Sequence, residues 1–239
     1  MKKEYIIGVI GGMGSYATLD FFRRLLEAFP AKKEWERPRI ILDNYCTMPS
    51  RVRAILYGER KDELIADLSK SAMNMCRGGV SRMVLACNTS HVFLHEVEKH
   101  VPECKDRFIH IINTLAGDMK NKDVKTAYLL ATEGTIDCGI YSDCFSPFGI
   151  KIVVPQIEQY SLLRGWIEAV KQNCISDSVL ESFTKFIDEC SETSLILGCT
   201  ELPILYARAL QVGWKPKPTV FDPLESVIDF LKKEYHLSN

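Results

Sequence analysis

Two cysteines stand where the sequence permits acid–base chemistry. Cys87, in RMVLACNTSHV (residues 82–92), and Cys199, in SLILGCTELPI (residues 194–204), each follow a short apolar run and precede polar residues. A thiol is a good proton carrier because its unperturbed pKa is about 8.5, and a helix N-terminus or nearby donors lower that pKa. Two thiols on opposite sides of a cleft can remove a proton from one face of a carbon atom and return one to the other face. That reaction is racemisation or epimerisation without a cofactor.

Short apolar runs alternate with amphipathic stretches along the chain, and they indicate the elements that must position the thiols. Buried strands are predicted at residues 5–10, 39–45, 82–86, 126–131, 151–154 and 194–197. Helices are predicted between them, the later ones at 88–99, 157–170, 179–190 and after residue 200. The first helix is expected to bury Leu19, Phe22, Leu26 and Phe29 and to stop at Pro30. Strands that alternate with long helices are typical of parallel βαβ units, so the predicted fold class is α/β.

The strand, small residue, Cys, Thr pattern occurs once in each half of the 239-residue chain, and YIIGVIGGMGS finds a weaker counterpart in KTAYLLATEGT. Two similar lobes are therefore expected, one from residues 1–100 plus 213–239 with Cys87, the other from 101–212 with Cys199. The final helix, from about Pro223, is expected to pack on the first lobe. Ligands of parallel sheets bind beyond the carboxyl ends of the strands. Both cysteines should therefore face a cleft between the lobes.

Composition excludes several classes of protein. Lys plus Arg total 30 against 31 for Asp plus Glu, which gives no sign of nucleic-acid binding. No stretch approaches the roughly 18 apolar residues of a membrane span, and the start of the chain is interpreted as a strand rather than a signal peptide. The nine cysteines include no CxxC pair, which argues against a disulfide framework and a structural zinc site and favours the cytoplasm. Seven of them are expected to be packing residues.

Other residues have a simple structural interpretation beside a functional one. His91 and His95 are spaced to share a helix face, but no HExxH motif accompanies them, so no metal site is predicted. GGMG lacks the GxGxxG spacing of a dinucleotide site. Arg51, in a loop beyond a strand, is the arginine we expect to face an anionic substrate. Lys171 at a helix end can simply interact with the helix dipole.

The motifs ACNTSH (86–91), GCTELP (198–203) and IGVIGGMGS resemble those of the aspartate/glutamate racemase superfamily, most closely its aspartate racemase branch of amino-acid racemases. The resemblance implies two pseudo-symmetric, flavodoxin-like lobes, each a parallel sheet flanked by helices, with the active site in the cleft between them. It also implies an amino-acid substrate, no pyridoxal phosphate or other cofactor, and a homodimer. Cys87 and Cys199 match the two catalytic acid–base residues. The positions that match substrate-binding residues are Met13, Arg51, Asn88, Thr89, Thr132, Thr135, Lys171, Thr200 and Glu201.

Some positions depart from the pattern of that branch. Ser15 replaces a frequent Pro, Ser90 a usual Ala, and Ala131 a common Gly, whereas Glu201 matches the aspartate type. The sequence thus predicts a racemase of aspartate or glutamate, with the substrate side chain open because small changes around a cleft alter which side chain fits. The alternatives are a racemase of another amino acid, a hydantoin racemase or maleate isomerase relative, and a non-enzymatic module that binds an amino acid.

Overall fold

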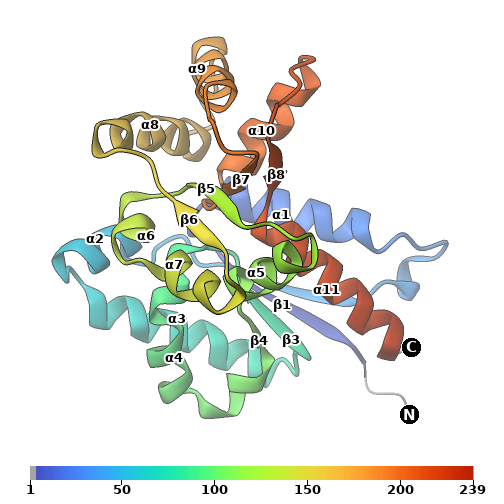
Figure 1. Cartoon of the computed structure of the whole chain (residues 1–239). Helices are drawn as coiled ribbons and strands as arrows, with labels where there is room; N and C mark the ends of the chain where they lie inside the picture. Colours follow the sequence, from blue (N-terminus) through green and yellow to red (C-terminus); the bar gives the residue numbers. More distant parts are fainter. Residues whose placement is uncertain (1–3, 239) are drawn as a thin grey trace.

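The computed structural model describes residues 4–238 and contains two four-stranded sheets (Figure 1). The first consists of β1 (Ile6–Gly11), β2 (Arg39–Asn44), β3 (Arg82–Leu85) and β4 (Phe108–Ile109), in the order β2-β1-β3-β4. The second consists of β5 (Thr126–Leu130), β6 (Lys151–Val153), β7 (Ser194–Leu197) and β8 (Thr219–Phe221), in the order β6-β5-β7-β8. All neighbouring strands are parallel. The two sheets repeat one topology, which confirms the predicted α/β fold with two pseudo-symmetric lobes.

Helices flank both sheets. In the first half of the chain they are α1 (Ser15–Ala28), α2 (Arg51–Tyr57), α3 (Lys61–Arg77), α4 (Leu94–His100) and α5 (Ile111–Asn121). The second half contains α6 (Glu133–Asp137), α7 (Ile140–Phe145), α8 (Tyr160–Lys171), α9 (Asp177–Asp188), α10 (Leu202–Gln211) and α11 (Pro223–Ser238). The helix expected from residue 88 starts as a 3-10 segment, η2 (Thr89–Phe93), before α4.

The buried face of α1 differs from the predicted one. Leu19 is 61% exposed, and Phe22 and Leu26 are only partly buried. The helix residues that are buried are Ala17, Thr18, Phe21 and Leu25. Thr18 accepts a hydrogen bond from Gly12 N–H at 2.9 Å and donates one to Gly14 O at 2.8 Å, so its side chain must face the turn after β1. This contact sets the rotation of the helix, and Leu19 consequently faces outward.

A core shared by both sheets joins the lobes. It contains Ile7 and Val9 of β1, Ala127 and Leu129 of β5, and the inner face of α11. Glu234 of α11 accepts hydrogen bonds from Tyr5 and Arg82, which confirms that the final helix packs on the first lobe.

Two short strands belong to the sheet of the other lobe than the one to which their residue numbers were assigned from the sequence. β4 lies within 101–212 but pairs in the first sheet, and β8 lies within 213–239 but pairs in the second. The remaining extent of the two lobes stays a prediction.

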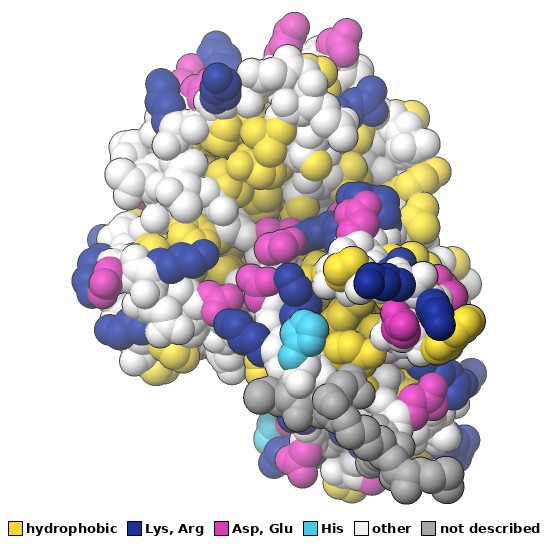
Figure 2. Space-filling view, turned by 90° about the vertical axis from the view of Figure 1, so that its right-hand side faces the viewer, with side chains coloured by type: hydrophobic (Ala, Val, Ile, Leu, Met, Phe, Trp, Pro, Cys, Tyr) yellow, Lys and Arg dark blue, Asp and Glu magenta, His cyan; other side chains and the backbone are white. Residues whose placement is uncertain are grey.

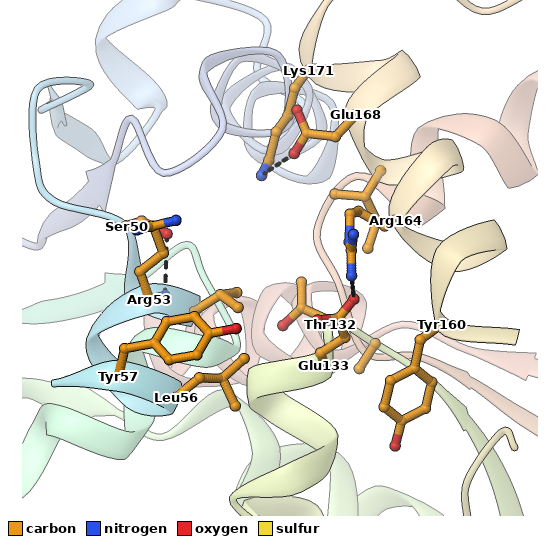
Figure 3. Close-up of a pocket in the computed structure, with 13 residues that line it drawn as sticks. Ser50, Arg53, Leu56, Tyr57, Thr132, Glu133, Tyr160, Arg164, Glu168 and Lys171 are labelled. Atoms are coloured by element: carbon orange, nitrogen blue, oxygen red, sulfur yellow. Dashed lines mark hydrogen bonds and ion pairs between the residues drawn. The ribbon is translucent and has the colours of Figure 1, made fainter. Parts of the chain in front are cut away.

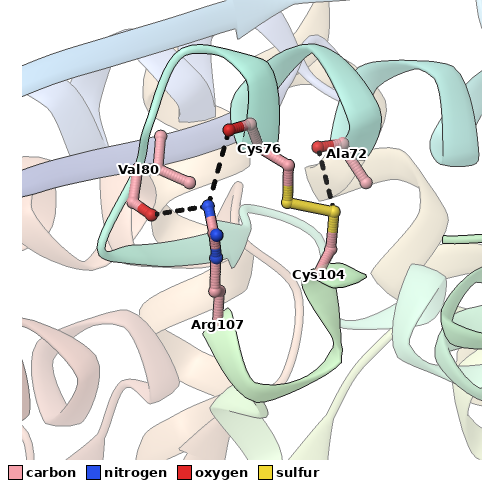
Figure 4. Close-up of a disulfide and its surroundings, with 5 residues drawn as sticks. All are labelled: Ala72, Cys76, Val80, Cys104 and Arg107. Atoms are coloured by element: carbon pink, nitrogen blue, oxygen red, sulfur yellow. Dashed lines mark hydrogen bonds between the residues drawn. A yellow bond between two sulfur atoms is a disulfide. The ribbon is translucent and has the colours of Figure 1, made fainter. Parts of the chain in front are cut away.

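Cys76, at the end of α3, and Cys104, in the 3-10 segment η3 (Pro102–Arg107), form a disulfide (Figure 4). Their Cα atoms are 6.1 Å apart, within the range that a disulfide spans. The expectation that seven cysteines merely pack is therefore wrong for this pair. The two cysteines are 28 positions apart in the sequence, and their spacing does not show that η3 folds back onto α3. The expectation is wrong also for Cys46 and Cys174, which are exposed.

The surface over α1 and α11 carries cationic and anionic side chains interspersed with one another (Figure 2). On α1, for example, Arg23 pairs with Asp20 and Glu27. This mixture agrees with the balanced composition. Within residues 4–238, no helix is long and apolar enough to cross a membrane.

Candidate active site

Both cysteines lie at the topological switch points of their sheets. In the order β2-β1-β3, the loops that follow β1 and β3 diverge to opposite faces and leave a crevice at their carboxyl ends. Cys87 follows β3, and Cys199 follows β7 at the equivalent point of the second sheet. The two crevices meet in one small cavity of about 40 Å³ that both cysteines line. The predicted site residues that line it with them are Met13, Arg51, Asn88, Thr89, Thr132, Lys171, Thr200 and Glu201.

Cys199 is a buried thiol held against a carboxylate. It is 7% exposed, and its Sγ donates to Glu201 Oε2 at 2.9 Å. Burial, and after it the Glu201 carboxylate, raise the pKa of the Cys199 thiol well above its ordinary value. The expectation that a helix N-terminus lowers this pKa is therefore wrong for Cys199. The thiol keeps its proton at neutral pH.

Lys171, the last residue of α8, places a cation beside this pair. Burial lowers the pKa of its ammonium group, but the neighbouring carboxylates, Glu201 first and then Glu168, raise it above the ordinary value. Nζ also lies 3.2 Å from Glu168 Oε1, and that carboxylate is half exposed, so this ion pair contributes little. Lys171 therefore stays charged in the cavity.

The glycine-rich turn after β1 is fitted to Glu201. A Cβ at Gly14 would collide with Glu201 Oε1, so a larger residue at this position would require the buried carboxylate to move. Gly12 adopts a positive φ of 81°, which favours glycine as well. Met13, between them, is 3% exposed and receives the Ser90 hydroxyl on its sulfur at 2.8 Å.

Arg51, the first residue of α2, is held by backbone carbonyls. Nη1 donates to Pro49 O at 3.0 Å, and Nη2 donates to Met13 O at 2.7 Å. These two bonds fix the plane of the guanidinium group. Its Nε is buried and has no hydrogen-bond partner in the part of the chain that the structure describes.

Unpaired polar atoms concentrate in this cavity. Over residues 4–238, four buried side-chain N or O atoms lack a hydrogen-bond partner: Arg51 Nε, Ser69 Oγ, Asn88 Nδ2 and Glu201 Oε1. Three of the four belong to residues that line the cavity. Leaving a buried polar atom unpaired costs about 1–3 kcal/mol, and more for charged groups. The residues that line the cavity therefore include two unpaired donors, Arg51 Nε and Asn88 Nδ2, and one unpaired carboxylate oxygen, Glu201 Oε1.

Three of the four threonines predicted as substrate contacts form a hydrogen-bonded cluster that spans the two lobes. Thr89 Oγ1 lies 2.8 Å from Thr135 Oγ1 and 3.2 Å from Thr132 Oγ1. Thr135 is 1% exposed and is not among the residues that line the cavity. This cluster joins the loop after Cys87 to the N-terminus of α6.

His91 has a role that the sequence did not reveal. It is buried, Ile111 N–H donates to its Nε2 at 3.4 Å, and its Nδ1 lies 3.0 Å from Cys87 O. Since Nε2 accepts, Nδ1 carries the hydrogen and donates it to Cys87 O. Burial, then the charge of His110, lower the pKa of His91 to about 3. The neutral ring therefore fixes the backbone of Cys87. The one feature of the sequence that could have indicated this contact is the four-residue spacing between Cys87 and His91.

Both ring nitrogens of His91 are thus engaged, and His95 is exposed. Among the described residues, no group of three or more His, Cys, Asp or Glu side chains is placed to hold a metal ion.

The small cavity adjoins a larger outer chamber of about 390 Å³ (Figure 3). Ser50, Val52, Thr132 and Lys171 line both spaces. The chamber lies between α2, with Tyr57, and α6 and α8, where Arg164 points at Glu133 and forms an ion pair.

The chain resembles known racemases in both sequence and structure. The sequence profile of the Asp/Glu/Hydantoin racemase family matches residues 10–231. The chain belongs to this family. It is accordingly an amino-acid racemase family member, an isomerase, with the fold of the solved racemases.

Individual racemases show the same likeness. The broad specificity amino-acid racemase RacX of Bacillus subtilis (strain 168) is 24% identical over 205 residues, or 82% of this chain and 86% of that protein. The aspartate racemase of Picrophilus torridus superposes with a TM-score of 0.82 at 25% identity, covering 97% of this chain and 94% of the other. An aspartate racemase homologue from Pyrococcus horikoshii OT3 gives a TM-score of 0.72 at 24% identity, covering 100% and 99%.

Proposed function

We propose that this racemase interconverts the enantiomers of an acidic amino acid, aspartate or glutamate, by proton transfer between Cys87 and Cys199 without a cofactor. The observation that carries the proposal is the combination of two thiols with three unpaired polar atoms in one cavity. The donors Arg51 Nε and Asn88 Nδ2 suit an α-carboxylate, and Glu201 Oε1 suits an α-ammonium group.

The charge of the cavity favours an acidic side chain. Its lining contains the cations Arg51 and Lys171 and the single carboxylate Glu201. While both cysteines hold their protons, a zwitterion with an acidic side chain carries one net negative charge and balances this excess, whereas a neutral amino acid leaves one cation uncompensated. Unpaired charge in a buried site is costly.

The proposed reaction needs both thiols in opposite protonation states. The thiolate of one cysteine takes the α-proton and becomes a thiol, and the electron pair of the C–H bond moves onto the substrate carboxylate. The thiol of the other cysteine then gives its proton to the opposite face of the carbon and becomes a thiolate. Preorganised donors such as Arg51 and Asn88 stabilise the developing charge, and one such donor is commonly worth about 3–4 kcal/mol.

NMR in D₂O tests the proposal. The protein is incubated with L-aspartate, L-glutamate and a panel of other L-amino acids, and loss of the α-proton signal and formation of the D-isomer are followed. Exchange with inversion is expected for an acidic substrate. Cys87→Ser and Cys199→Ser should abolish inversion while leaving the fold intact, and the exposed Cys174→Ser serves as the matched control. Full inversion in either single variant would refute the two-thiol mechanism.

A racemase of a larger amino acid is the second candidate, favoured by the outer chamber that adjoins the cavity. Inversion of bulky members of the panel, without inversion of aspartate or glutamate, would replace the first proposal with this one. Tight binding without α-proton exchange would instead favour a binding module. We further propose a cytoplasmic homodimer, as the family resemblance and the composition suggest, with sedimentation velocity as the test of its assembly.

A further inference from the structure

The two polar atoms of the Asn88 side chain have different surroundings. Oδ1 accepts a hydrogen bond from the Tyr141 hydroxyl at 2.7 Å. Nδ2 is buried and, as far as residues 4–238 are concerned, has no partner. Asn88 is 2% exposed and lines the catalytic cavity directly after Cys87. An amide presents its oxygen and its NH₂ group on opposite sides, so holding the oxygen at Tyr141 leaves the NH₂ group free for a ligand.

Tyr141 is well suited to hold this oxygen. It belongs to α7 of the second lobe, is 1% exposed, and stacks on Phe145 with ring centroids 5.7 Å apart. Both rings lie in the core that the two sheets share, so the hydroxyl cannot move away. Burial, followed by neighbouring negative charges, raises the pKa of Tyr141 well above its ordinary value. The hydroxyl therefore remains a donor over the working pH range.

We propose that Tyr141 is a positioning residue that fixes the Asn88 amide with Nδ2 toward the substrate carboxylate. The inference rests on the proposed racemase function and deepens it. Asn88 Nδ2 then donates to the carboxylate as negative charge develops there during α-proton removal. A flipped amide would turn its carbonyl oxygen toward the same carboxylate and repel it. A side chain of the second lobe thus sets the orientation of a donor in the first lobe.

A spectroscopic test reports on the amide without requiring turnover. In ¹⁵N-labelled protein, the side-chain NH₂ signals of Asn88 are identified by their loss in Asn88→Ala. Tyr141→Phe should shift these signals. The matched control is Tyr128→Phe, because Tyr128 also donates to an amide oxygen, Gln159 Oε1 at 3.4 Å, in the same lobe. The control should leave the Asn88 signals in place. Unmoved Asn88 signals in Tyr141→Phe would overturn the proposal.

Kinetics then separate positioning from a general structural role. Tyr141→Phe is expected to lower kcat for α-proton exchange about tenfold, the effect of one misplaced hydrogen-bond donor. Added to Asn88→Ala, it should cause no further loss, because Tyr141 acts through that amide. Losses that simply multiply in the double variant would count against the proposal. If wild-type protein exchanges no compound of the panel, the proposed function fails, while the Asn88 signals still decide whether Tyr141 positions the amide.

Discussion

Arg51→Lys separates the charge of the residue from its shape. In the wild-type protein, Nη1 and Nη2 are used by the carbonyls of Pro49 and Met13, at 3.0 and 2.7 Å, and the buried Nε is left for a ligand. Lysine keeps the positive charge but carries one ammonium group on a flexible stem. It cannot hold both carbonyls and also present an N–H group where Nε lies.

The expected magnitude follows from one lost contact to the substrate. A hydrogen bond that involves a charged group contributes about 1.5–3 kcal/mol, which corresponds to a decrease of about 10- to 150-fold in kcat/KM. The assay is the initial rate of α-proton exchange on the substrate that the panel identifies. Thermal unfolding is measured in parallel, because the loss of two backbone contacts also lowers stability.

The control for this substitution is Arg23→Lys on α1. Arg23 is 54% exposed on its side chain and pairs with Asp20 and Glu27, so its replacement should leave kcat/KM unchanged. A folded Arg51→Lys protein with wild-type kcat/KM would show that Nε makes no contact to the reacting substrate, and the reasoning from unpaired atoms would be refuted for this residue.

Two further substitutions test the surroundings of the thiols. Glu201→Gln removes a charge that raises the pKa of Cys199, so iodoacetamide should alkylate Cys199 faster at pH 8. The rate is measured by mass spectrometry of the peptide that contains Cys199. An unchanged rate would show that the Glu201 charge does not raise this pKa. His91 is neutral when folded, with a pKa of about 3, whereas an unfolded histidine titrates near 6.5. The unfolded chain therefore binds the extra proton between these values, and the stabilising effect of neutral His91 is present above pH 6.5 and lost as pH falls toward 3. Between pH 7.5 and 5.0, wild-type protein should lose about 2 kcal/mol of unfolding free energy that His91→Gln does not lose, as measured by urea denaturation; equal losses would argue against this assignment.

Much of the fold was predictable because its signals are local. Apolar runs such as 82–86 and 194–197 identify central parallel strands that are buried on both faces. The strands β4 and β8 were missed because neither shows an uninterrupted apolar run like IVV at residues 152–154, which reveals the equally short β6. The rotation of α1 was missed because it depends on a polar contact of Thr18 with the preceding turn rather than on hydrophobic spacing.

The candidate site likewise has features that the sequence predicts and features that it does not. That Cys87 and Cys199 share a cavity follows from the repeat of one motif in two halves. Asn88 hydrogen-bonds to Tyr141, 53 positions away, and Thr89 to Thr135, 46 positions away. Whether such distant residues meet depends on how the two lobes dock. A single sequence contains no local signal of that docking.

The repeated topology places the two thiols equivalently, but their neighbours differ. Cys199 donates to a buried carboxylate, whereas the backbone of Cys87 is fixed by a neutral histidine. In the proposed mechanism, the reactions from the two enantiomers follow one path in opposite directions, so this difference does not alter the equilibrium between them. Because burial and the Glu201 carboxylate keep the proton on Cys199, this thiol is the proton donor of the resting state in the proposed mechanism. An ammonium group bound at Glu201 would offset the carboxylate charge that holds the proton on Cys199, so the substrate itself would help this thiol to give up its proton. In the proposed mechanism, Glu201 is therefore coupled to proton transfer through the substrate ammonium group.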